Sequence, residues 1–316
     1  MIAVRSRYKL GTEEMKREYL TPATEEEWLA LRLDDLTSTM TPALFGLSPY
    51  ITNFELYHSK VSGLDLSITE NDRMHKGKSL EQYAAQMIAE ERGWTVTPFK
   101  DYIRIPEARV ASSFDFEAIC PERGPGILEI KAVDFFQHKK KWLDGEAPEH
   151  IEIQLQHQLE VADKYEWGMI AAFTSIYDYV PYMRERDREF GAAIMAKAAE
   201  FWADVDARNE PSADFSRDGW AISQIYPGSG GDVDMTGDER FDYLAGKYER
   251  LSGEVKQATE ERDAVKAEIW KLLGDGKTGY GQQYKVAAGS TKGSAGTLVT
   301  PDMVGSYIGA RAGYRQ

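Results

Sequence analysis

The chain has 316 residues, of which 42% are hydrophobic and 28% are charged, a balance typical of a soluble globular protein. No apolar run approaches the ~18 residues that a bilayer-spanning helix requires, so we expect no membrane insertion. With 38 basic and 52 acidic residues, the formal net charge is −14, which argues against nucleic-acid binding through overall charge. Any contact with nucleic acid must therefore be local.

The start of the chain and its cysteine content indicate a compartment. The first twenty residues lack the apolar core of a secretory signal, and Cys120 is the only cysteine. We therefore expect a reducing, cytoplasmic compartment and no disulfide bonds. A cysteine-ligated iron–sulfur cluster built from this chain alone is excluded.

Helices separated by turn-forming residues are predicted in the first part of the chain. A capping-box pattern begins a helix at Thr24. Pro42 indicates a second short helix or turn after the hydroxyl-rich bend at 37–41. Over 72–94, apolar and small side chains recur at helical spacing until Gly93 ends the helix.

The middle of the chain alternates between strand and helix patterns, which predicts a small sheet with a hairpin. In chain order we expect short strands within 95–105 and 108–119, a turn at 120–126, a strand at 127–133, a helix at 149–163, a pair of strands within 167–182 and a helix at 188–208.

In the C-terminal part, apolar or small residues recur from Phe241 onward in alternating steps of three and four residues, and Arg262 interrupts the series. This series, which we call the seam, continues through Leu244, Tyr248, Leu251, Val255, Ala258, Val265, Ile269 and Leu272. This spacing predicts a long helix or helical hairpin, followed by a Gly-rich tail with a small hairpin. We favour packing of the seam against the rest of the chain over an intermolecular coiled coil, because the charged flanks look irregular.

Two charged residues lie inside the apolar run "ILEIKAV" and point to a site. Glu129 and Lys131 share one face of an extended strand, with Cβ atoms about 7 Å apart. If the preceding strand pairs across the turn, Asp115 lies next to Glu129. Two close carboxylates repel unless a cation lies between them, and hard oxygen ligands suit one or two Mg²⁺ or Mn²⁺ ions.

Lys131 would orient or help deprotonate an attacking water and offset charge on a phosphoryl oxygen. Together with the metal-binding acids, this describes phosphodiester hydrolysis. The alternative is an ion pair between Glu129 and Lys131 on the solvated face of an edge strand.

Several motifs resemble one known family. Asp115 followed by the spaced "E-x-K", with an upstream "GKSLE" at 77–81, resembles the PD-(D/E)XK nuclease superfamily and, within it, the YqaJ-like viral recombinases typified by phage lambda exonuclease. The segments at 28–39 and 154–163 resemble the early W-x-x-L-R segment and the Q-x-Q helix of that family. These motifs occur in the family's order across about residues 24–175.

The resemblance implies roles for individual residues. Asp115, Glu129 and Glu81 would hold metal or its water, Lys131 would be the catalytic lysine, and Gln154 would contact the active site. Arg32, Ser38 and Thr39 would receive the 5′-phosphate of the strand being degraded, which suits a guanidinium beside hydroxyl donors. The basic run Lys139, Lys140 and Lys141 would add DNA contacts.

One segment departs from the family pattern, because "SSFDF" stands where the family often has S-P-D-G. The acid is kept, but the turn around Asp115 differs. His75 stands where some related nucleases bind metal, and we favour a surface role for it. We expect a helix-face role for His157 rather than that of a general base.

The implied fold is α/β, a PD-(D/E)XK nuclease core with a mixed central sheet flanked by helices. We expect a YqaJ-like exonuclease domain over 1–235 and a helical extension over 236–316.

The implied activity is Mg²⁺-dependent digestion of double-stranded DNA, 5′ to 3′, which leaves a 3′ strand for a single-strand annealing recombinase. A homo-oligomeric ring would enclose the duplex in a locally basic channel, in the cytoplasm of the host cell if a phage encodes the protein. The alternatives are a structure-specific or restriction-like endonuclease on the same core, or an inactive DNA-end-binding scaffold.

Overall fold

The computed structural model describes residues 15–66, 72–133, 138–140, 142, 145–175 and 177–289, and for 72–79 it describes the backbone only. The chain divides into two compact units, Met1–Ser229 and Gly230–Gln316, and each is described by itself. None of the described helices is long and apolar enough to cross a membrane.

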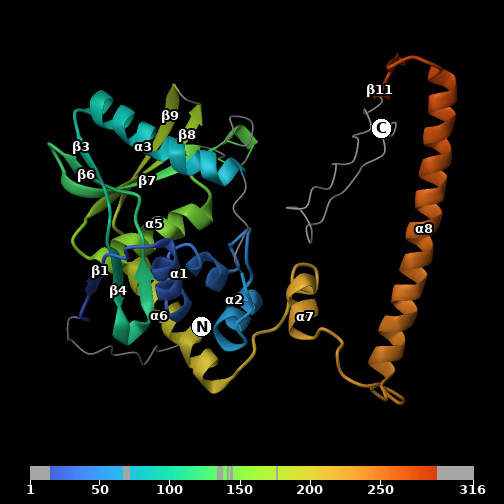
Figure 1. Cartoon of the computed structure of the whole chain (residues 1–316), viewed down its shortest axis with the longest axis horizontal. Helices are drawn as coiled ribbons and strands as arrows, with labels where there is room; N and C mark the ends of the chain where they lie inside the picture. Colours follow the sequence, from blue (N-terminus) through green and yellow to red (C-terminus); the bar gives the residue numbers. More distant parts are fainter. Residues whose placement is uncertain are drawn as a thin grey trace, which may run out of the picture. The chain divides into compact units, whose positions relative to one another are not determined.

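The first unit contains most of the regular structure (Figure 1). Its strands are β1 (Glu18–Leu20), β2 (Leu36–Thr37), β3 (Thr95–Pro98), β4 (Tyr102–Ile105), β5 (Val110–Ser112), β6 (Phe116–Cys120), β7 (Gly124–Ala132), β8 (Trp167–Ser175) and β9 (Asp178–Glu185). Its helices are α1 (Glu25–Asp34), α2 (Asn53–Val61), α3 (Asp72–Arg92), α5 (Glu149–Ala162), α6 (Arg188–Ala207) and α7 (Gly219–Ile225), with single 3₁₀ turns η1 (Thr41–Phe45) and η2 (Pro106–Ala108).

A mixed five-stranded sheet carries the strands that the sequence marked as functional. Its order is β3-β6-β7-β8-β9. The predicted hairpin is confirmed, because β6 and β7 pair antiparallel with Phe116 opposite Leu128. β7 and β8 pair parallel, and α5 lies in the crossover between them, as parallel neighbours require. β7 is therefore an interior strand.

Helices cover both faces of this sheet (Figure 1). Alternate residues of β7 point to opposite faces, so Leu128 packs in the same cluster as Ile88 of α3. Ile127 packs in the other cluster, with Leu155 of α5. The face that carries Ile127 is also the face of Glu129, so α5 is the helix that covers the candidate site.

The expectation of one central sheet is only partly correct, because a second sheet forms with the order β1-β4-β5-β2. β4 and β5 pair with each other across η2, where Arg109 adopts a φ of 52° and reverses the chain. Their partners are β1 and the parallel β2 rather than β3 or β6. The tight turn thus separates this pair of strands from the five-stranded sheet.

Local capping signals account for most of the helix boundaries. Thr24 accepts a hydrogen bond from the Glu27 amide at 3.2 Å and begins α1, as predicted. Gly93, at a φ of 65°, follows the end of α3. We did not predict α2, although Thr52 and Glu55 form a complete capping box at its start.

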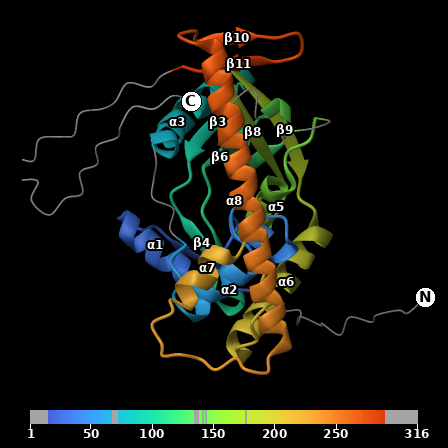
Figure 2. The same ribbon diagram turned by 90° about the vertical axis from the view of Figure 1, so that its right-hand side faces the viewer.

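The second unit contains one long helix, α8 (Glu239–Leu273), and a hairpin of β10 (Thr278–Tyr280) and β11 (Lys285–Ala287) (Figure 2). Both the long helix and the small hairpin in the Gly-rich segment confirm the prediction. Asp238 accepts from the Phe241 amide at 3.0 Å and caps the start of α8.

Candidate active site

The hairpin of β6 and β7 brings the predicted acids together. Asp115 immediately precedes β6 and therefore lies opposite the middle of β7. Its Oδ2 atom accepts a hydrogen bond from the Ile130 amide at 2.9 Å. This bond holds the Asp115 carboxylate close to Glu129, whose charge acts on it.

Glu129 is the centre of a closed hydrogen-bonded ring. Its Oε1 atom accepts from Lys131 Nζ and from Gln154 Nε2, both at 2.6 Å. Gln154 Oε1 in turn accepts from Lys131 Nζ at 3.0 Å. The structure thus brings together four predicted site residues, Asp115, Glu129, Lys131 and Gln154, across β6, β7 and α5.

Gln158 is a member of the site that sequence reasoning missed. Its Nε2 atom donates to the remaining oxygen of Glu129, Oε2, at 2.7 Å. Gln158 lies one helical turn after Gln154, so the i, i+4 spacing on α5 was a signal that could have found it. Its own Oε1 atom is buried and has no hydrogen-bond partner among the described residues.

The alternative of a solvated edge-strand ion pair is wrong. β7 lies between β6 and β8, and Glu129 is only 2% exposed. An ion pair at such a position loses much of its gain to desolvation and contributes little net stability. Stability alone therefore does not explain why these charges lie in an interior strand.

Burial and the neighbouring charges shift the pKa values of Asp115 and Lys131. Burial, then the Glu129 charge, raises the pKa of Asp115 well above its usual range, although Lys131 and the Ile130 amide oppose the shift. Burial by itself would lower the pKa of Lys131, but Glu129 and Asp115 outweigh it and raise that pKa. Lys131 is therefore a charged donor at neutral pH.

Glu81, on α3, lies close enough to the site to act on it electrostatically. Its charge contributes to raising the pKa of both Asp115 and Lys131, although other groups contribute more. Among the described residues, no group of three or more acidic, histidine or cysteine side chains converges closely enough to hold a metal ion. A role for Glu81 as a metal ligand stays a prediction.

Asp115 and Glu129 form a donor set that fits a hard divalent cation. Both are carboxylates, and the Lys131 ammonium offsets part of their charge at the centre of the site. A cation beside them would relieve the repulsion that raises the Asp115 pKa. The buried, unpaired Oε1 of Gln158 adds a neutral oxygen close to Glu129.

The predicted phosphate-binding residues also lie together. Arg32 donates from Nη2 to Thr39 Oγ1 at 3.0 Å and stacks over the Trp28 ring, with 4.3 Å between the guanidinium carbon and the ring centre. Ser38 is buried and accepts from Ser112 Oγ at 2.9 Å. Burial lowers the pKa of Arg32, which keeps its charge at neutral pH.

The segment that follows β5 links this cluster to the acids. Ser112 contacts Ser38, and the next residue, Ser113, accepts from the Trp28 indole at 2.8 Å. Asp115 comes two residues later. The cluster of Arg32, Ser38 and Thr39 is therefore connected to the carboxylate site through one short stretch of backbone.

His157 is a buried structural residue. Its Nδ1 lies 2.7 Å from Thr41 Oγ1, and its Nε2 lies 3.1 Å from the carbonyl oxygen of Ala111. Burial lowers the pKa of His157 to about 4, so the ring is neutral at physiological pH. It lies on the buried face of α5, where it connects α5 to η1 and β5.

The remaining predictions fall partly outside the described residues. Lys139 and Lys140 are exposed, and Lys141 lies outside the described residues. The side chain of His75 also lies outside them. The roles of the basic run and of His75 therefore stay predictions.

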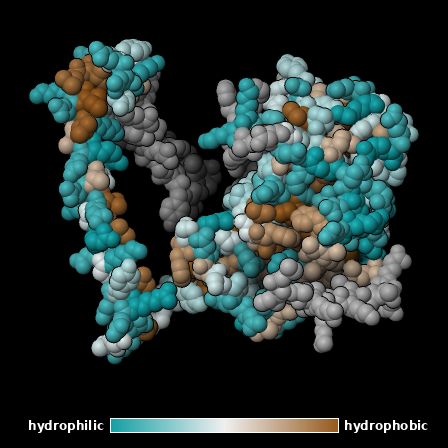
Figure 3. Space-filling view, turned by 180° about the vertical axis from the view of Figure 1, so that it is seen from behind, coloured by the Kyte–Doolittle hydropathy of each residue, from teal (hydrophilic) through white to brown (hydrophobic). Residues whose placement is uncertain are grey.

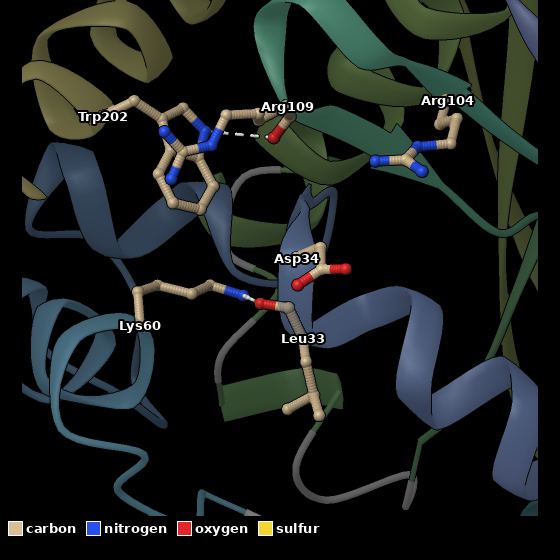
Figure 4. A pocket seen from close by; sticks show the side chains of 6 residues that line it. All are labelled: Leu33, Asp34, Lys60, Arg104, Arg109 and Trp202. Atoms are coloured by element: carbon tan, nitrogen blue, oxygen red, sulfur yellow. Dashed lines mark hydrogen bonds between the residues drawn. The ribbon is translucent and has the colours of Figure 1, made fainter. Parts of the chain in front are cut away.

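A separate cavity of about 250 Å³ is lined by Leu33, Asp34, Lys60, Arg104, Arg109 and Trp202 (Figure 4). Its cations already have partners. Lys60 donates to carbonyl oxygens at the end of α1, Arg104 pairs with Asp35 at 2.9 Å, and Arg109 pairs with Asp206 at 2.8 Å. This cavity contains none of the predicted site residues.

Comparisons with known proteins agree with the motifs. Residues 27–165 match the family model described as the YqaJ-like viral recombinase domain. The uncharacterised protein YqaJ of Bacillus subtilis (strain 168) is 28% identical over 182 residues, which cover 57% of this chain and 56% of that protein. The chain thus spans little more than half the length of this curated relative.

Two solved structures of one exonuclease also show similarity. LHK-Exo, an alkaline exonuclease from Laribacter hongkongensis, is 22% identical with a TM-score of 0.47, covering 62% of this chain and 99% of that one. LHK-Exo in complex with dAMP gives a TM-score of 0.48 at the same identity, covering 63% and 99%. The motifs at 28–39, 77–81 and 154–163 all lie within the family match, which confirms the resemblance seen in the sequence. Residues 27–165 are therefore similar to the YqaJ-like viral recombinase domain.

Proposed function

We propose that the protein is a metal-dependent deoxyribonuclease that digests double-stranded DNA from its ends, 5′ to 3′, and leaves a 3′ single strand. The observation that supports this most is the ring of Glu129, Lys131 and Gln154 beside Asp115 on an interior strand. Acids and a lysine in this arrangement suit hydrolysis of a phosphodiester bond.

Asp115 and Glu129 would hold the metal, with Glu81 as a further ligand directly or through water. When bound, Mg²⁺ or Mn²⁺, as one or two ions, would polarise the phosphate and lower the pKa of a bound water. Lys131 would donate a hydrogen bond to the attacking water or to a phosphoryl oxygen, since its ammonium is charged. Gln154 would hold the Lys131 ammonium in place through its 3.0 Å contact.

Arg32, Ser38 and Thr39 would receive the terminal 5′-phosphate. A guanidinium that is already oriented by the Trp28 ring and by the Thr39 hydroxyl loses little freedom on binding. The same cluster would set the polarity of digestion, because the phosphate that it receives lies at the 5′ end of the strand being degraded.

Assembly and partners complete the proposal. A homo-oligomeric ring would enclose the duplex, with Lys139, Lys140 and Lys141 in its channel. The 3′ strand would pass to a single-strand annealing recombinase. The exonuclease domain would be residues 1–235, and 236–316 would be an extension.

The test is digestion, in Mg²⁺, of linear duplexes labelled at either end, with and without a 5′-phosphate, and of covalently closed circles. We expect the 5′ label to be released first and the circles to survive. Cleavage of the circles would identify an endonuclease, and earlier release of the 3′ label would overturn the polarity.

Site variants show whether the described ring carries the reaction. Asp115→Asn and Lys131→Met should abolish digestion while circular dichroism stays unchanged. Lys164→Met is the matched control, because Lys164 is half exposed and pairs with Glu117 outside the ring. Full digestion by both site variants would refute the assignment, and binding of DNA ends without any cleavage by the wild type would favour a scaffold.

A further inference from the structure

The helix α1 carries Trp28 and Arg32 but has little apolar packing to hold it. The surface of the first unit is mainly hydrophilic, with hydrophobic residues gathered in the middle of the face that Figure 3 shows. α1 is a surface element of this unit, since none of its residues is buried and Leu29 and Leu33 are 47% and 69% exposed. Because helices in proteins are stabilised mainly by packing of an apolar face, α1 needs other contacts to keep its position.

Lys60 of α2 supplies such contacts at the end of α1. Its ammonium donates to the carbonyl oxygens of Arg32 at 3.0 Å, Leu33 at 2.8 Å and Asp35 at 2.9 Å. Figure 4 shows the Lys60 side chain extending toward the Leu33 carbonyl. The last carbonyl groups of a helix have no partner within it, and an ammonium has three N–H donors, so Lys60 can satisfy several of them at once.

These bonds act on the backbone that carries the cluster of Arg32, Ser38 and Thr39. One of them is made to Arg32 itself. Another is made to Asp35, which directly precedes β2, and Ser38 and Thr39 follow that strand. Lys60 therefore fixes the backbone on both sides of the connection between the guanidinium and the hydroxyl groups.

The charge of Lys60 suits this position. A cation near the C-terminus of a helix interacts favourably with the helix dipole. Burial has the largest effect and lowers the pKa of Lys60 to about 8, whereas the Asp35 charge opposes this shift. The Arg32 charge also lowers the pKa of Lys60, so the two cations act on each other. A phosphate anion bound by Arg32 would stabilise both charges.

A surface ion pair does not explain the placement of Lys60. The nearby Asp35 carboxylate already accepts hydrogen bonds from Arg104 at 2.9 Å and from Tyr102 at 3.1 Å. The Lys60 ammonium is instead directed to backbone oxygens, and burying it there costs free energy. The contacts of Lys60 thus determine the geometry of the α1 backbone.

We propose that Lys60 is a positioning residue for binding of the 5′-phosphate. Its ammonium holds the end of α1, so that Arg32 presents its guanidinium to the phosphate together with Ser38 and Thr39. This inference rests on the proposed function, because it adds Lys60 to the cluster that would receive the 5′-phosphate. Lys60 acts through Arg32 and takes no part in the hydrolysis itself.

Steady-state digestion of linear duplexes with and without a 5′-phosphate tests this role in the full-length chain. Lys60→Met keeps a long side chain but donates no hydrogen bond. It should raise KM for the 5′-phosphorylated duplex about tenfold, while kcat and the KM for the 5′-hydroxyl duplex stay close to the wild-type values. Lys60→Arg keeps a charged donor and should recover most of the preference for the 5′-phosphate.

Arg208→Met is the matched control, because Arg208 donates to the Val61 carbonyl at the end of α2 and not to α1. It should leave the preference for the 5′-phosphate unchanged. An unchanged preference in Lys60→Met, or an equal rise in KM for both duplexes, would overturn the positioning role. A wild type without any preference would refute the phosphate-binding part of the proposed function, and this inference with it.

Hydrogen exchange provides a second measurement, which needs no DNA. In Lys60→Met the amides of residues 30–36 should exchange at least severalfold faster than in the wild type, whereas those of α5 should keep their rates. Unchanged exchange at 30–36 would overturn the anchoring of α1, whatever the digestion assay gives. Equally faster exchange in α5 would assign Lys60 to the stability of the whole unit and would also overturn the positioning role.

Discussion

Gln158 holds one oxygen of Glu129, while Lys131 and Gln154 share the other. Hydrogen bonds to a charged group contribute about 1.5–3 kcal/mol. Loss of the bond from Gln158 should therefore let the Glu129 carboxylate rotate out of position. We expect Gln158→Met to reduce the rate of duplex digestion roughly 10- to 100-fold at saturating DNA.

The matched control for this variant is Gln156→Met on the same helix. Gln156 bonds the Glu185 carbonyl and the Asp187 amide, and it does not contact Glu129. The control therefore loses comparable buried hydrogen bonds. It should keep the wild-type rate of duplex digestion when the two variants are assayed at temperatures at which they are equally folded. Equal losses in both variants would show that Gln158 acts only through stability.

His157 should make the fold sensitive to acid. Its pKa is about 4 in the folded state, against an ordinary value near 6.5, so the unfolded chain binds more protons between these values. Stability is therefore retained above pH 6.5 and lost as the pH falls toward 4. Between pH 7 and pH 5 the loss from this group is about 2 kcal/mol.

Urea unfolding of wild type and His157→Asn at pH 7 and pH 5 measures this contribution. The variant should be less stable at pH 7, because Asn cannot replace both the Thr41 and the Ala111 contacts. Its stability should, however, change less between the two pH values. An identical pH dependence in both proteins would assign the acid sensitivity to other groups.

At the scale of elements, β7 shows what local sequence determines. The alternation that placed Glu129 and Lys131 on one face follows from strand geometry alone, and the turn residues before β7 fixed the hairpin. The i, i+4 spacing places Gln158 on the same face of α5 as Gln154, but its contact with Glu129 also needs the packing of α5 on the sheet. The split into two sheets likewise depends on the pairing of β2 with β5, which lie far apart in sequence.

Gly126 allows β7 to lie against a large side chain of the next strand. A Cβ atom at this position would come within 2.3 Å of the Trp167 ring, which is 2% exposed and cannot withdraw into solvent. Gly126→Ala should therefore destabilise the protein by about 1–3 kcal/mol, as overpacked cores do.

Thermal or urea unfolding measures this effect, with Gly230→Ala as the control. A Cβ atom at Gly230 meets nothing within 4 Å, so the control should leave the midpoint nearly unchanged. If Gly126→Ala unfolds like the control, the strand must be able to move away from Trp167.

At the scale of the whole molecule, the two units differ in how they are stabilised. Both buried hydrophobic clusters consist of residues before Ser229, and their last member in sequence is Val205. Apart from Ala288, the described residues of the second unit contribute no hydrophobic side chain to the buried set. The first unit thus has its own core, as an independently folding domain requires.

A chain that ends at Ser229 should therefore fold alone. Its urea midpoint at low protein concentration should match that of the corresponding transition of the full chain, because the residues removed supply almost none of the buried apolar area. The truncated chain should also keep the Asp115 and Glu129 site and digest duplex ends. A truncated chain that is insoluble, or that unfolds at a clearly lower urea concentration, would show that the second unit stabilises the first.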